Sequence, residues 1–462
     1  AGFKSPPEVD QLVRDMQTAH ANVVFAQVRK RGDAYFNQTI EPRADDLRAL
    51  PDFDPLAYLI ARAHAANPPI EVHAWLNALS IANANELPTD PSHIFAQHGP
   101  DASGDALWLA SNANGRFIAD NLYFLDPGHP AAAQHIVNVY LNLVRNYDVD
   151  GIHLDFIRYA GNQWGYNLVS LARFNARIGA TGTPAAKDAR WSQWRRDQVT
   201  ALVRQIYLQS IAVKPNLKVS AALIAWGNGP QHDDDWQRTS AYSDVLQDWQ
   251  AWLQEGILDL AVPMNYDNER NAQQAQWFDQ WIEWEKNHTA DRQLVVGLGA
   301  FLNDFDGTLA QLQRARTPSA TNQRAHGVAL YSYASSDPRG LAVGKFFRAL
   351  TQPDDATGAP PPFASIVRAP TMAWKTNPTT GHLMGVARLA DGRFADGLTV
   401  MVSGATTRTL LTSGTGFFGA TALPPGAYTV TIARGAQTLA TAQTTVSAGQ
   451  VATVDFERVA GE

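Results

Sequence analysis

The sequence of 462 residues contains no cysteine. This absence excludes disulfide bonds, thiolate metal sites and a cysteine nucleophile. No run of about 18 apolar residues occurs, so the sequence predicts no segment that spans a membrane. Charge is also scarce, because only 18% of the residues are charged and the formal net charge is -7. We therefore expect neither nucleic acid nor an anionic membrane as a partner.

Signature motifs of several enzyme classes are missing as well. There is no Gly-x-Ser-x-Gly elbow, so the sequence gives no signal of an esterase nucleophile. No His-x-His or His-x-x-x-His spacing occurs, and residues 297–299 lack the full glycine fingerprint of a phosphate loop. The sequence therefore predicts neither a metal nor a cofactor.

The sequence does contain a regular alternation of helix and strand patterns. From residue 7 to about residue 345, amphipathic stretches alternate with short apolar ones, which predicts an α/β fold with a parallel sheet. The predicted strands are residues 22–29, 70–77, 149–159, 218–226, 258–266, 294–299 and 327–333. We interpret this region as a (β/α)8 barrel of the TIM type. Seven strands are one short of a complete barrel, so the first strand is expected upstream of Ala1 unless the fold closes in another way.

Composition divides the chain into a barrel, a linker and a smaller domain. Within the barrel at residues 1–350, an insertion at residues 78–125 is too long for a connecting loop and is expected to form a cleft wall. Residues 351–362 form a Pro- and Gly-rich linker. Residues 363–462 alternate short strands with turns, which predicts a β-sandwich accessory domain. The stretch 385–456 resembles the prealbumin-like, carboxypeptidase-regulatory sandwiches.

The segment 149–159 carries the strongest functional signal. Its apolar residues alternate with His153 and Asp155, so these two side chains are expected to point into the barrel. Barrel enzymes keep their chemistry at the carboxyl ends of the strands, where Asp155 lies. The alternative is that Asp155 is only a buried partner of Arg158 or His153.

The same parity turns side chains of two neighbouring strands inward. These are Gln27, Arg29, Glu71, His73, Trp75 and Asn77. Polar groups inside a barrel are costly unless they pair with one another or with a ligand. A buried ion pair between Glu71 and Arg29 is therefore the alternative to a role in ligand binding.

Glycoside hydrolysis needs a second carboxylate, about 5 Å from the first for retention and farther for inversion. Glu269, just after the strand at 258–266, is the leading candidate for this partner of Asp155. Asp267 and Asp33 are the other candidates, and each of the three is alternatively a solvated loop acid.

Aromatic residues gather at the predicted carboxyl ends of the strands, where flat rings suit the apolar faces of sugars. The predicted stacking residues are Trp75, Trp226 and Tyr266, with Tyr331 and Tyr333 nearby. The predicted partners of sugar hydroxyls or of an acidic sugar group are Arg29, His73, Asn77, Arg158 and Asn265.

Taken together, these motifs resemble the family-10-like glycosyl hydrolases. The matching runs are residues 27–29, 32–35, 53–57, 71–77, 125–130, 147–155, 194–196 and 262–266. The resemblance implies a (β/α)8 barrel, an exported bacterial protein, secreted or periplasmic, and hydrolysis of a polysaccharide such as peptidoglycan glycan or exopolysaccharide. Asp155 matches the aspartate of the fourth strand in the family. This chain departs from the family at Phe156, where a second acid is common, and at Asp267, where an aromatic residue is usual.

We therefore interpret the protein as an endo-acting glycoside hydrolase. In this hypothesis Asp155 is the nucleophile or the stabilising carboxylate and Glu269 is the proton donor. Two alternatives stay open, namely a carbohydrate-binding barrel without catalysis and a metal-assisted polysaccharide deacetylase.

Overall fold

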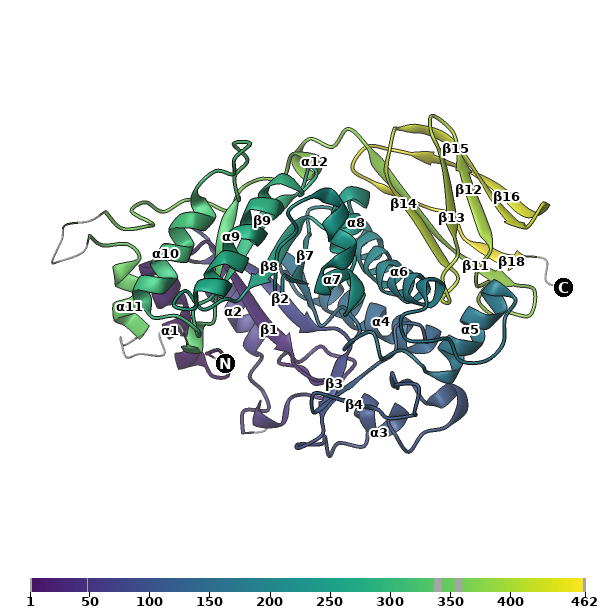
Figure 1. The fold of residues 1–462 in the computed structure, drawn as a ribbon, viewed down its shortest axis with the longest axis horizontal. Coiled ribbons are helices and arrows are strands. Elements are labelled where there is room, and N and C mark those ends of the chain that lie inside the picture. The colour runs from purple at the N-terminus through teal and green to yellow at the C-terminus, as the bar shows by residue number, and fades with distance from the viewer. Residues whose placement is uncertain (1, 48, 336–342, 354–357, 359, 460–462) are drawn as a thin grey trace.

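The computed structural model describes residues 2–47, 49–335, 343–353, 358 and 360–459. Its main element is a curled sheet of seven parallel strands that forms an incomplete, TIM-like barrel (Figure 1). In sheet order these are β1 (Val23–Arg29), β2 (Glu71–Asn77), β6 (Gly151–Asp155), β7 (Lys218–Ile224), β8 (Leu260–Asn265), β9 (Gln293–Gly299) and β10 (Gly327–Tyr331). The prediction of an α/β barrel with seven strands is confirmed, and β1 and β10 form the two edges of the sheet.

Helices connect successive strands and lie on the outside of the sheet (Figure 1). They are α1 (Pro6–Thr18), α2 (Pro55–His64), α4 (Pro130–Asn146), α5 (Leu168–Ile178), α6 (Ala189–Val213), α7 (Ser240–Ser243), α8 (Trp249–Glu255), α9 (Ala272–Asn287), α10 (Phe305–Arg316) and α11 (Val343–Ala349). Their starts follow ordinary capping chemistry. The Asp54 side chain accepts a hydrogen bond from Ala57 N ahead of α2, and Asp188 accepts one from Trp191 N ahead of α6.

The insertion after β2 folds as a small unit of its own. It contains β3 (Ser80–Asn83), α3 (Ile94–His98), β4 (Ile118–Ala119) and β5 (Leu122–Phe124), and its three strands form an antiparallel sheet in the order β3-β5-β4. Ala78 N donates to the carbonyl of Asp155 at 2.7 Å. The insertion therefore begins beside the carboxyl end of β6.

The C-terminal region forms two further sheets with a hydrophobic core of their own. One contains β11 (Gly381–Leu389), β14 (Phe417–Leu423), β17 (Val451–Thr453) and β18 (Phe456–Val459), and the other contains β12 (Thr399–Ser403), β13 (Thr407–Leu411), β15 (Gly426–Arg434) and β16 (Gln437–Val446). Residues 354–357 and 359 of the predicted linker lie outside the described residues. The exact division at residues 350 and 362 stays a prediction.

A segment just before β11 packs against the amino-terminal end of the barrel. Met372 is buried beside Leu260 and Val262 of β8. In α12 (Ala373–Thr376), the Trp374 indole N–H donates to Asp259 at 2.7 Å, and the Lys375 ammonium lies 3.1 Å from the same carboxylate. This segment therefore closes the end of the barrel that lies opposite Asp155. No helix among the described residues is long and apolar enough to cross a membrane.

Candidate active site

Asp155 is the last residue of β6 and is only 8% exposed. Its Oδ2 accepts a hydrogen bond from the Trp75 indole N–H at 3.0 Å, and its Oδ1 accepts one from Phe156 N at 2.7 Å. Burial raises the pKa of Asp155, although these hydrogen bonds and the charge of Arg158 act in the opposite direction. Phe156 has a φ of 49°, a left-handed conformation that is costly for a bulky residue and is concentrated at functional sites.

Three aromatic side chains surround this carboxylate. Tyr331 stacks on Tyr266 with ring centroids 5.3 Å apart, and its ring centroid lies 6.0 Å from that of Trp75. Burial raises the pKa values of Tyr266 and Tyr331, and the charge of Asp155 raises both further, which places these phenols near the carboxylate. Because Tyr331 is 38% exposed, this aromatic frame is open to solvent.

A cation and a second exposed ring complete the rim. The Arg158 guanidinium lies 5.2 Å from the ring centroids of both Phe156 and Trp226, and Trp226 is 46% exposed. Burial lowers the pKa of Arg158, whereas the charges of Asp155 and Asp120 raise it. Asp120 lies on the turn between β4 and β5 of the insertion. The sequence predicted the insertion as a cleft wall but did not single out this acid.

The histidines predicted to point inward have contacts inside the barrel. His73 is buried, and its ring meets Phe25 edge-on at 5.3 Å. His153 Nδ1 lies 2.9 Å from Ser220 Oγ, and burial lowers the pKa of His153 to about 3. His73 therefore packs inside the barrel, one layer below the site. Asn77 binds the Lys30 carbonyl through its Nδ2.

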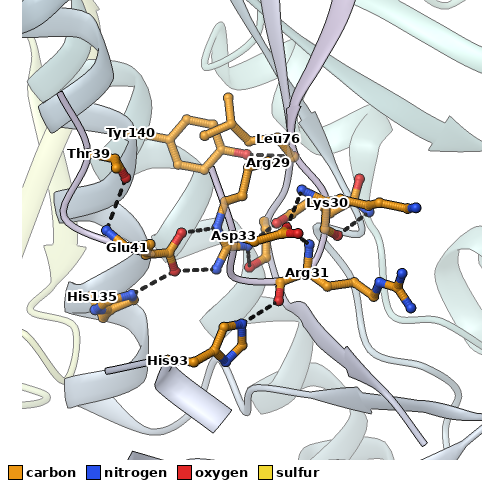
Figure 2. A network of polar contacts seen from close by, with 12 residues as sticks. Arg29, Lys30, Arg31, Asp33, Thr39, Glu41, Leu76, His93, His135 and Tyr140 are labelled. Atoms are coloured by element: carbon orange, nitrogen blue, oxygen red, sulfur yellow. Dashed lines mark hydrogen bonds and ion pairs between the residues drawn. The ribbon is translucent and has the colours of Figure 1, made fainter. Parts of the chain in front are cut away.

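The Arg29 side chain points at Glu41, as Figure 2 shows. The β1 strand is irregular between Gln27 and Arg29, and Arg29 is 1% exposed. Its Nε and Nη2 donate to the two oxygens of Glu41 at 2.6 and 2.7 Å, and its Nη1 donates to the carbonyl oxygens of residues 77 and 78. The alternative prediction, an ion pair between Arg29 and Glu71, was wrong. Arg29 pairs with Glu41, and Glu71 pairs with Lys218.

Asp33 has a local structural contact. Its Oδ1 accepts hydrogen bonds from the backbone N–H groups of Lys30 and Arg31 at 3.2 and 2.8 Å, within the loop after β1 (Figure 2). Such a contact stabilises a turn. The structure does not bring Asp33 into contact with Asp155.

Glu269 is held in the helix layer. Both of its carboxylate oxygens accept from the Arg314 guanidinium of α10, at 2.6 and 2.7 Å. The same guanidinium also binds Asp279 of α9. A bidentate ion pair of this kind suits an ionised carboxylate rather than a proton donor.

Asn265, the last residue of β8, and Asp267 both lie on the side of the sheet that faces α9, because both interact with Glu285 of that helix. The Asn265 Nδ2 donates to Glu285 of α9 at 3.0 Å, and both side chains are fully buried. Burial raises the pKa of Asp267 to about 7 and that of Glu285 to about 8. The prediction that Asn265 binds sugar conflicts with this geometry, because Asn265 faces α9 whereas Tyr266 faces Asp155.

The buried carboxyl of Glu285 predicts a specific pH dependence of stability. Its pKa is about 8 in the folded protein against 4.5 for a free glutamate side chain, so its stabilising effect is complete below about pH 4.5 and is lost as the pH rises through 8. Glu285→Gln resembles the protonated form. We expect it to raise the free energy of unfolding by roughly 2 kcal/mol or more at pH 9, with little change at pH 5. Denaturation at both pH values, with the exposed Asp291→Asn as control, checks this, and an equal effect at both would contradict it.

Comparison with known proteins shows the family of this chain. The family model described as "Glycosyl hydrolase-like 10" matches residues 3–303, which include six of the seven barrel strands and the insertion. The chain belongs to this family. Within the described residues, no group of three or more His, Asp or Glu side chains could hold a metal ion.

Two bacterial glycosyl hydrolases are similar in sequence to this chain. Glycosyl hydrolase YngK of Bacillus subtilis (strain 168) is 28% identical over 313 residues, which cover 65% of this chain and 57% of YngK. Glycosyl hydrolase DigH of Escherichia coli (strain K12) is 24% identical over 268 residues, which cover 54% of this chain and 56% of DigH. The chain therefore matches just over half the length of these curated relatives.

A solved structure shares the fold. The glycoside hydrolase domain of PgaB (BpsB) from Bordetella bronchiseptica superposes with a TM-score of 0.54 and 17% sequence identity, covering 74% of this chain and 92% of that domain. At this identity the similarity shows the barrel fold alone.

Proposed function

We propose that this protein is an endo-acting glycoside hydrolase that cleaves a bacterial cell-envelope or extracellular polysaccharide. The observation that supports this most directly is the position of Asp155, a buried carboxylate of raised pKa at the carboxyl end of β6, beneath exposed aromatic rings. The names of the relatives, glycosyl hydrolases and a glycoside hydrolase domain, point to the same reaction class. Such substrates lie outside the cytoplasm, so secretion or export to the periplasm is part of the proposal.

In this mechanism Asp155 acts in its ionised form. The Trp75 indole N–H donates to Oδ2 and the Phe156 N–H donates to Oδ1, so the carboxylate has one defined orientation. It would attack the anomeric carbon or stabilise the positive charge that develops there. Trp226 and Tyr331 offer exposed ring faces on which sugar units would stack.

The proposed reaction is tested by incubating the protein with a panel of bacterial glycans. Reducing ends and released acetate are measured with and without a chelator. Reducing-end release that the chelator does not affect supports the hydrolase. Acetate release that the chelator abolishes would identify the deacetylase instead. Binding measured by calorimetry without any new reducing ends would identify a carbohydrate-binding barrel.

The proton donor is a separate part of the proposal. The sequence favoured Glu269, with Asp267 as the alternative, but Glu269 is clamped by Arg314 and Asp267 lies beside the helix layer. The charge of Asp120, on the turn of the cleft wall, acts on Arg158 as that of Asp155 does, so Asp120 lies on the same side of the barrel as Asp155 and is a further candidate for the donor.

A substrate with an activated leaving group identifies the donor, because such a leaving group needs no proton. We expect Asp120→Asn to lose about 100-fold in kcat on a natural glycan and much less on an aryl glycoside. Glu269→Gln is expected to stay within about tenfold of wild type on both substrates. The reverse pattern would return the donor role to Glu269, and the same pattern in Asp267→Asn would assign it there.

A further inference from the structure

Arg158 makes few hydrogen bonds compared with other arginines of this protein. Arg29, Arg204 and Arg314 each place two guanidinium nitrogens on a carboxylate. The buried Arg195 has no carboxylate partner among the described residues, but it donates to three backbone carbonyl oxygens. Arg158 has no carboxylate within 4.0 Å in the part of the chain that the structure describes, and its side chain donates one hydrogen bond, from Nη1 to the Tyr159 carbonyl at 3.2 Å. A guanidinium carries five N–H donors, so most of its capacity is unused.

The two rings beside it explain how this cation is held. The ring centroids of Phe156 and Trp226 both lie 5.2 Å from the guanidinium carbon, and such contacts stabilise a cation through the ring faces. Contacts with ring faces do not use up the hydrogen-bonding capacity of the guanidinium, so its N–H groups can bind a planar anion. Burial nevertheless lowers the pKa of Arg158, so the site favours a negative partner.

We propose that Arg158 binds the carboxylate of an acidic sugar next to the bond that is cleaved. The sugar ring would stack on the exposed face of Trp226 while its carboxylate meets the guanidinium edge. Two acidic groups, Asp155 and Asp120, act on the same guanidinium from β6 and from the insertion. Their charge makes a monoanionic carboxylate a better occupant than a phosphate dianion. This proposal rests on the proposed function and names its substrate class, an acidic polysaccharide.

The test uses one glycan in two forms. An acidic glycan cleaved by the wild type is compared with the same glycan after its carboxyl groups have been reduced to alcohols. We expect kcat/KM to fall at least tenfold on reduction, mainly through KM. Arg158→Gln is expected to show a ratio close to one between the two forms, and Arg158→Lys an intermediate ratio, because lysine keeps the charge but not the planar edge.

The outcomes separate the two proposals. A wild type that cleaves both forms equally well would overturn the role of Arg158 and leave the hydrolase standing. Equal losses on both forms in Arg158→Gln would assign Arg158 to the positioning of Asp155 and would likewise overturn carboxylate recognition. If no glycan is cleaved, calorimetry with uronic-acid and muramic-acid oligosaccharides tests Arg158 directly. Binding that Arg158→Gln abolishes supports the recognition without the hydrolase, and the absence of binding overturns it.

Discussion

Asp155→Asn is expected to lower kcat on any cleaved glycan by at least about 10³-fold while the fold stays intact. Asparagine has nearly the same shape and can still accept the Trp75 N–H, but it provides neither a nucleophile nor a negative charge. Burial raises the pKa of Asp155, so the ionised side chain is costly in the folded state. The asparagine amide nitrogen cannot accept the hydrogen bond from Phe156 N, and this loss offsets the removal of the buried charge, so we expect the melting temperature to change little. Reducing-end assays and thermal unfolding of the same sample measure both effects.

Asp248→Asn is a closely matched control. Its carboxylate accepts the indole N–H of Trp236 at 2.9 Å, as Asp155 accepts that of Trp75 at 3.0 Å, and burial raises its pKa too. Asp248 precedes α8 and has no contact with the aromatic frame around Asp155. Its substitution should leave kcat within a few-fold of wild type. Activity that survives Asp155→Asn, or that falls equally in both variants, would contradict the assignment of Asp155.

The strand order and the position of Asp155 could be predicted because both depend on local patterns. Apolar alternation and turn residues defined all seven strands, and strand parity pointed Asp155 and Trp75 into the same space. The Trp75–Asp155 hydrogen bond is the direct consequence of that parity, since Asn77 pairs with Asp155 in the register of β2 and β6.

The same rule shows why Asn265 was misplaced. Tyr266 faces Asp155, so its neighbour in the sequence must face α9, where a buried Glu285 receives it. We predicted both residues to bind sugar at the same rim of the barrel. Because strand side chains alternate with a period of two residues, the sequence alone predicts that Asn265 and Tyr266 face opposite sides of the sheet.

Other contacts depended on information that strand patterns do not contain. The irregularity between Gln27 and Arg29 redirects Arg29 to Glu41, and a local bulge of this kind has no clear signal in a single sequence. The Arg314–Glu269 pair joins residues 45 positions apart in the sequence, one on α10 and the other on the loop before α9. Long-range pairs of this kind are fixed by tertiary packing. The sequence correctly predicts that Glu269 follows the strand β8, but it does not predict that Glu269 pairs with Arg314.

Glu41→Ala is expected to have the largest effect on stability. Arg29 and Glu41 are both almost completely buried, and the charge and hydrogen bonds of Arg29 hold the pKa of Glu41 below its usual range although burial acts to raise it. Removal of the carboxylate leaves the Arg29 cation buried without its partner. We expect a loss of about 3–5 kcal/mol in the free energy of unfolding, measured by denaturant titration. Asp10→Ala, which breaks the exposed pair with Arg62, should cost less than about 1 kcal/mol.

A double variant separates the ion pair from the other contacts of Arg29. In Arg29→Met with Glu41→Leu no charge of the pair remains, so the double variant should lose less stability than the sum of the two single variants. Its residual loss reports the hydrogen bond between His135 and Glu41 together with the bonds from Arg29 to the carbonyl oxygens of residues 77 and 78, which anchor the end of β2 where the insertion starts. Because Trp75 precedes this anchor by two residues, the single variants should also weaken catalysis. Additive losses of stability would show that Arg29 and Glu41 act independently, and the buried pair would then not be the element that holds this end of the barrel.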